Sequence, residues 1–130
     1  MKIVSLITQE SFKKIMTKEC EGRLEELGEY WGGCLGSGDV RRNALEKIKK
    51  AGGADILLGC WGTPEIDEDV VNACGSLRLF VYGAGSIKSV ISREMLERGI
   101  RVTTAAPAIG LGVAEFTVTQ IYAFSKKIFY

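Results

Sequence analysis

The sequence predicts one α/β domain built on a parallel β-sheet. Five short apolar runs of strand length alternate along the 130 residues with segments whose apolar residues recur every three or four positions. The run 54–60 is continuously apolar, as expected for a central strand that helices cover on both faces. Because each helix carries the chain back to the same edge of the sheet, the strands are expected to run parallel, with right-handed crossovers.

The first half of the chain predicts two strands and two helices. The strands are expected at 2–7 and 29–31, and the helices at 12–27 and 40–51. Asp39 precedes the second helix, where its carboxylate can accept a backbone N–H bond from the first turn. The stretch 32–39 is rich in glycine and is expected to be loop.

The second half predicts three strands, two short helices and one long helix. The strands are expected at 54–60, 77–82 and 100–104, and the helices at 68–74, 87–98 and 113–128. Asp67 stands at the N-cap of the first of these helices, with two further acidic residues in the favourable first turn. The small-residue stretch 105–112, around Pro107, is expected to be loop.

The glycine turn after the fourth predicted strand is the most distinctive feature. Gly83-Ala84-Gly85-Ser86 joins that strand to a segment with helical spacing, so outward-pointing N–H groups and a helix dipole would form a seat for a carboxylate or phosphate. The position where a dinucleotide fingerprint needs its third glycine holds Lys88, which argues against pyrophosphate binding. The alternative is an ordinary turn that needs glycine for its dihedral angles and binds nothing.

Composition excludes several kinds of function. A net charge of +1 gives no indication of nucleic-acid or membrane-surface binding, and no apolar run reaches membrane-spanning length. The four cysteines form no CxxC pair, so reduced thiols, a cytoplasmic location and no metal site are expected. Histidine is absent, which removes the commonest general acid or base.

Four pieces of the second half carry a family resemblance. In order they are ILLGCWGTPEID, LRLFVYGAGSIKSV, RGIRVTTAAPA and GVAEFTVTQIYAFSKK. Together they resemble the D-isomer-specific 2-hydroxyacid dehydrogenases, and the VAE helix after RGI-x-V is the most specific piece. Residues 1–53 fit the topology of that family but carry no distinctive motif.

The resemblance implies a division of the chain. Residues 1–108 would form a flavodoxin-like three-layer substrate domain, with a five-stranded parallel sheet and helices on both faces. Residues 109–130 would form the long crossover helix that leads to a Rossmann domain absent from this sequence. In the family that second domain binds NAD or NADP and supplies the catalytic arginine, acidic residue and histidine. The resemblance thus implies a fragment that is inactive alone and binds no cofactor.

The resemblance also assigns a substrate site. In the family, backbone amides of the glycine turn hold the carboxylate of a small 2-hydroxy or 2-oxo acid, and these map to Ala84, Gly85 and Ser86. The preceding loop, which lines the same cleft, maps to Trp61 and Gly62. Trp61 has an alternative role as a hydrophobic lid or domain-contact residue.

The resemblance places one residue near the nicotinamide. Thr104 stands where many members have asparagine, so its cofactor contact is in doubt. In the family a returning C-terminal segment packs against this domain, so the resemblance implies exposed apolar surface around Phe116, Ile121, Phe124 and Ile128 and predicts a homo-oligomer. A rival hypothesis is a non-catalytic module of the same descent that binds small anions or another protein.

Two other α/β families fit less well. A receiver domain needs an acidic pair after the first strand, where Thr8-Gln9 stands, and an aspartate after the third, where Cys60-Trp61 stands. A flavodoxin proper needs a phosphate-binding loop after the first strand, and Thr8-Gln9-Glu10-Ser11 matches it poorly.

Overall fold

Five parallel strands form one sheet in the computed structural model, which describes residues 1–128. The strands are β1 Lys2–Ser5, β2 Glu29–Trp31, β3 Ile56–Gly59, β4 Leu79–Tyr82 and β5 Arg101–Thr104. Their order across the sheet is β2-β1-β3-β4-β5, and every neighbouring pair is parallel. This is the flavodoxin-like strand order, in which the direction of winding reverses between β1 and β3. The predicted fold class is confirmed.

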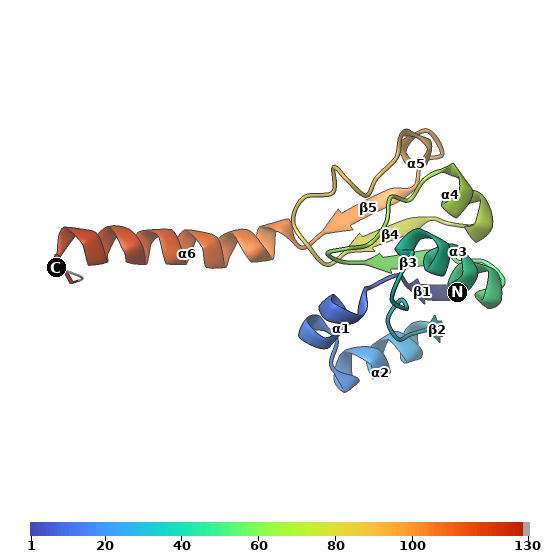
Figure 1. Ribbon diagram of the computed structural model, residues 1–130, viewed down its shortest axis with the longest axis horizontal. Coiled ribbons are helices and arrows are strands. Elements are labelled where there is room, and N and C mark those ends of the chain that lie inside the picture. The colour runs from blue at the N-terminus through green and yellow to red at the C-terminus, as the bar shows by residue number, and fades with distance from the viewer. Residues whose placement is uncertain (129–130) are drawn as a thin grey trace.

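Helices lie on both sides of this sheet. They are α1 Gln9–Ile15, α2 Lys18–Leu27, α3 Val40–Ala51, α4 Glu68–Cys74, α5 Arg93–Glu97 and α6 Ala106–Ser125. The first two cover one side, the next three cover the other, and α6 extends away from the domain (Figure 1). Fully buried Leu57, Phe80 and Met95 lie in the core between these layers.

The helices differ from the prediction at three places. The helix predicted over 12–27 is broken, because Met16 is extended and the Thr17 side chain accepts a bond from the Cys20 N–H to cap a new helix. The long helix begins at Ala106, so the predicted loop at 105–112 is wrong. A proline in the first turn is well placed to start a helix there.

The third difference affects the glycine turn directly. The helix predicted from residue 87 begins only at Arg93, where the Ser92 side chain caps it. The intervening segment forms a parallel bridge between Ile91 and Ile66, and Ser92 Oγ donates to Ile66 O at 2.6 Å. No helix therefore starts at the turn, and the predicted contribution of a helix dipole to anion binding there is wrong.

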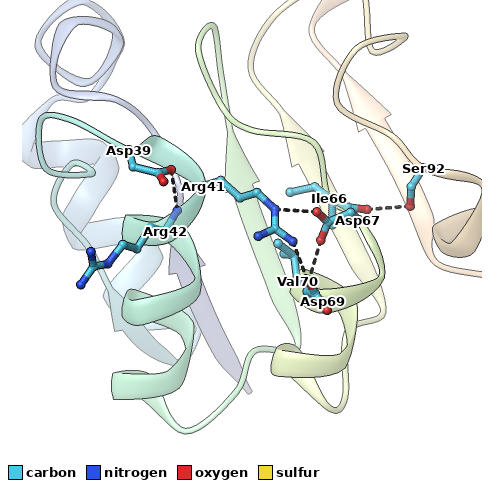
Figure 2. Close-up of polar contacts among 8 residues, drawn as sticks. All are labelled: Asp39, Arg41, Arg42, Ile66, Asp67, Asp69, Val70 and Ser92. Atoms are coloured by element: carbon cyan, nitrogen blue, oxygen red, sulfur yellow. Dashed lines mark hydrogen bonds and ion pairs between the residues drawn. The ribbon is translucent and has the colours of Figure 1, made fainter.

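An ion-pair cluster joins α3 to α4 (Figure 2). Arg41 Nε donates to Asp67 Oδ2 at 2.7 Å, and Arg41 Nη2 donates to Asp69 Oδ2 at 2.5 Å. Asp67 also caps α4, because its Oδ1 accepts from the Val70 N–H at 3.1 Å. Burial favours the neutral acid, but the bonds from Arg41 and Val70 outweigh it and hold the pKa of Asp67 below its ordinary value.

Replacing Arg41 by methionine is expected to lower the free energy of unfolding by about 0.5–1 kcal/mol at neutral pH, the usual range for partly exposed pairs. The depressed pKa of Asp67 means that its contribution is present above pH 3.8 and is lost as the pH falls further. Urea unfolding at pH 7 and pH 3 measures the difference. Arg42→Met, which removes an exposed pair within α3, is the matched control and should have a smaller effect.

The long helix α6 is exposed along its length. Phe116 and Tyr122 are each 65% exposed and Ile121 is 64% exposed, although all three are large apolar side chains. The helix contains a single charged residue, Glu115. Within residues 1–128, no helix is long and apolar enough to cross a membrane.

Candidate functional site

The predicted site residues gather at one edge of the sheet. The loops after β1, β3, β4 and β5 all leave from the carboxyl ends of parallel strands, so they lie along the same rim. The segment 60–62 follows β3 and the turn 83–86 follows β4, and these two strands are paired through Gly59 and Tyr82. The structure thus places the two predicted halves of the substrate site on neighbouring loops.

A buried hydroxyl fastens the loop after β3 to the end of β1. Thr63 Oγ1 donates to Leu6 O at 3.1 Å and accepts from the Cys60 N–H at 2.9 Å. Next to it, Gly62 has φ +81°, and a Cβ there would lie 3.0 Å from a methyl carbon of Thr8. Gly62 is therefore required by the conformation and packing of this loop, independently of any ligand.

The turn after β4 is fastened at both ends. The Gly83 N–H donates to Gly59 O at 2.8 Å, and the Ala105 N–H donates to both Tyr82 O and Ala84 O at 3.1 Å. In contrast, the N–H groups of Ala84, Gly85 and Ser86 have no acceptor among residues 1–128. Ala84 is buried as a whole residue, whereas Gly85 is half-buried and Ser86 is exposed, so the open side of the turn lies at residues 85 and 86. Three consecutive amides of a rigid turn are thus left without an internal partner in the described part of the chain.

Gly85 is not explained by the fold itself. Gly83 and Gly85 do not have positive φ, so their dihedral angles do not require glycine. A Cβ added to Gly85 would have nothing within 4 Å, so internal packing does not require glycine there either. The alternative of a turn that needs this glycine for its backbone conformation is therefore not supported. A glycine with open space above free amides is instead suited to the close approach of a ligand.

A pocket of about 420 Å³ opens on the β1 side of the loop after β3. Its walls come from the loop after β3, the segment after β1 and the start of α3. They are formed by Thr8, Glu10, Ser11, Lys14, Val40, Trp61 and Gly62. Trp61 is 52% exposed, so its indole is available to a ligand in the pocket.

Sequence reasoning missed the contribution of the segment after β1. Both Thr8 Oγ1 and Ser11 Oγ donate to Trp61 O, at 3.1 and 2.9 Å, across about 50 residues of sequence. Glu10 and Lys14 form an ion pair at 2.7 Å at the pocket rim, and this pair lowers the pKa of Glu10. The signal available in the sequence was the position of these polar residues. They follow β1, one of the two strands between which the direction of winding reverses, and ligands bind at that point of such sheets.

Thr104 has a structural partner. It ends β5, and its Oγ1 accepts from the Ala106 N–H at 3.3 Å, which satisfies one of the free amides at the start of α6. Its predicted role near a nicotinamide stays a prediction. Among residues 1–128, no group of three or more His, Cys, Asp or Glu side chains lies close enough to hold a metal ion.

A smaller pocket of about 190 Å³ lies between the loop after β2 and α3, and Lys47 is one of the residues that line it. Lys47 Nζ donates to Gly32 O at 2.7 Å and to Gly33 O at 2.9 Å, which holds the glycine-rich loop against α3. Burial lowers the pKa of Lys47 to about 8, because the charged amine loses part of its hydration.

This lowered pKa predicts a change of stability in alkali. Between pH 8 and 10.5 the unfolded chain binds a proton at Lys47 that the folded chain does not, so folding becomes more favourable as the pH rises through that window. In Lys47→Met this gain should be missing, whereas the control Lys49→Met, at an exposed position, should keep it. Denaturant midpoints at pH 7.5, 9 and 10 measure the difference, and parallel profiles for all three proteins would contradict the prediction.

This chain matches known proteins in its structure and not in its sequence. No family model matches the sequence, and no curated protein sequence matches it. A protein of Thermus thermophilus shares the fold over 98% of this chain, with a TM-score of 0.64 and 18% identity. An Entamoeba histolytica 3-phosphoglycerate dehydrogenase with bound NAD+ matches 95% at TM-score 0.57 and 23% identity. Escherichia coli D-lactate dehydrogenase matches 82% at TM-score 0.52 and 14% identity.

These matches concern part of each longer protein. The chain spans 38%, 38% and 31% of those three structures, respectively. At identities below 25% the likeness is one of fold, and the fold implied by the sequence resemblance is thereby confirmed. Two of the three structures are dehydrogenases by name, one of D-lactate and one of 3-phosphoglycerate.

Proposed function

We propose that this chain is the substrate-binding part of an NAD- or NADP-dependent 2-hydroxyacid dehydrogenase. The observation that carries the proposal is the turn at Ala84, Gly85 and Ser86, with three amides unpaired within residues 1–128 and open space above Gly85. Oriented N–H groups of this kind bind a carboxylate, because an anion can accept several short bonds from them at once. The ligand is a small 2-hydroxy or 2-oxo acid.

The chain's residues do not fit a nicotinamide dinucleotide. The glycine turn lacks the third glycine, and the nearest helix after it, α5, begins seven residues beyond Ser86. The cofactor is therefore assigned to a further domain, as is the acid–base group, because this sequence contains no histidine. When bound there, the cofactor supplies or accepts the hydride.

The role left to this chain is positioning. The amide turn fixes the carboxylate, which orients the neighbouring hydroxyl or carbonyl carbon toward the rim of the sheet. Trp61 and the loop that holds it form a wall that shields the ligand from water when a second domain closes over it. A substrate that is held by its carboxylate and by one wall can present only one face to a cofactor. Hydride transfer at that face would then form or consume a single enantiomer.

The proposal is tested by nuclear magnetic resonance of the isotope-labelled chain. Titration with pyruvate should shift the backbone amide signals of residues 84–86 and the indole signal of Trp61. Pyruvamide, which has the same shape without the charge, is the matched control and should shift them far less. Equal shifts from both compounds, or shifts confined to residues outside this rim, would count against a carboxylate seat.

A second candidate is a non-catalytic module that binds a small anion or another protein. The extended apolar surface of α6 and the absence of histidine favour it. The source gene distinguishes the two hypotheses. A reading frame that continues into a strand followed by GxGxxG supports the enzyme, and a stop codon after residue 130 supports the module.

A further inference from the structure

Three side chains that line the pocket behind Trp61, those of Thr8, Glu10 and Ser11, present oxygen acceptors to it. A hydroxyl group carries one proton and two lone pairs. Thr8 and Ser11 both direct their protons to Trp61 O, so toward a ligand their oxygens can only accept. The Glu10 carboxylate accepts from Lys14 Nζ at 2.7 Å, and its remaining lone pairs make it a third acceptor.

The remaining groups point to the same ligand chemistry. The exposed indole of Trp61 offers a π-face, which attracts cations. Lys14 is the cation already present, and its pair with Glu10 is solvent-exposed, with side chains 64% and 82% accessible. Exposed pairs of this kind are weak, so a ligand that brings its own cation can replace Lys14 at little cost.

We infer that this pocket binds a positively charged hydrogen-bond donor, an ammonium or guanidinium group, at the distal end of the substrate. The inference rests on the proposed function for the position of the carboxylate, which would lie on residues 84–86. The loop after β3 separates the two sites, and neighbouring strands lie about 4.8 Å apart, so the ligand spans on the order of 5–10 Å. The substrate class is then a 2-hydroxy or 2-oxo acid with a basic side chain.

Fluorescence of Trp61 reports on the pocket directly. Trp31→Phe leaves Trp61 as the one indole in this chain of two tryptophans, and serves as the background for every variant. The probes are 5-guanidino-2-oxopentanoate, the uncharged 2-oxooctanoate, the diacid 2-oxoadipate, and propylguanidine, which has no carboxylate. The guanidino acid is expected to bind about tenfold more tightly than the uncharged acid, a difference typical of one charge-assisted bond.

Two substitutions test which residues recognise the cationic group of the ligand. Glu10→Gln should weaken the guanidino acid about tenfold, since one charge-assisted bond is lost, and should leave 2-oxooctanoate unchanged. Lys14→Gln should strengthen the guanidino acid a few-fold, because the competing cation is gone. Lys13→Gln is the matched control, since this neighbouring lysine is exposed and does not line the pocket. All three positions are exposed, so equal thermal midpoints are expected.

The outcomes separate this inference from the proposed function. If both acids bind equally and Glu10→Gln has no effect, the pocket inference is wrong while the carboxylate seat stands. If propylguanidine binds in a Glu10-dependent way but neither acid binds, the pocket stands and the proposed function fails. Tighter binding of 2-oxoadipate than of the guanidino acid, lost in Lys14→Gln, would overturn the inference in favour of an acidic tail.

Discussion

Replacing Gly85 by valine is expected to abolish the binding of small 2-oxoacids while leaving the fold intact. A Cβ at this position meets nothing within 4 Å, and φ is not in the left-handed region, so the substitution introduces neither clash nor backbone strain. The branched side chain would nevertheless stand over the free amides of residues 84–86 and hold a carboxylate away from them. We expect at least a hundredfold loss of affinity, with the thermal midpoint within about 2 °C of wild type.

Gly22→Val is the matched control. Gly22 lies in α2, and it too has nothing within 4 Å of an added Cβ. This variant should keep full affinity for pyruvate and should not lose stability, because valine is a better helix former than glycine. Gly85→Ala, a smaller change, should give an intermediate loss of affinity. If Gly85→Val binds pyruvate as the wild type does, the turn is not the carboxylate seat.

The second large effect is expected on the assembly state. Soluble monomers rarely expose apolar patches beyond about 300–600 Å². An aromatic side chain presents roughly 150–250 Å², so Phe116 and Tyr122, each 65% exposed, already account for much of that on α6. Further exposed apolar side chains of the helix are Ile109, Leu111, Val113, Val118 and Ile121. We therefore expect the 130-residue chain to self-associate through α6 at micromolar concentration.

The double variant Phe116→Glu, Ile121→Glu is expected to be monomeric, because two charges of the same sign cannot be buried in such an interface without a partner. Light scattering across a wide concentration range measures the change. Leu96→Glu makes an equivalent apolar-to-charged change at a 59% exposed position on α5, and should leave the assembly as it is. A wild-type chain that stays monodisperse and monomeric throughout would show this prediction to be wrong.

Much of the fold could be predicted because it rests on local signals. The five strands occupy the predicted runs, since a buried parallel strand must be apolar on both faces. Asp39 and Asp67 cap α3 and α4 as predicted, because each carboxylate bonds an N–H only three residues away. The alignment of the loops after β3 and β4 followed from strand order alone.

Part of what failed depended on partners far away in sequence. The spacing of Ile87, Ile91 and Met95 suits a helix, yet the pairing of Ile91 with Ile66 holds that segment extended. Apolar periodicity records which residues are buried, and it does not record what they are buried against. The same limit hid the roles of Thr8 and Ser11, whose acceptor is the backbone oxygen of Trp61.

The sequence by itself determined the layered architecture, the rim where a ligand would sit and the glycine turn at its centre. The tertiary structure decided that no helix dipole supports that turn, that its three amides find no acceptor within residues 1–128, and that a pocket rich in acceptors lies behind Trp61. The physical reason is the distance along the chain over which each effect acts. Propensity, capping and periodicity act within a few residues, whereas the shape and charge of a site arise from contacts between loops about 50 residues apart.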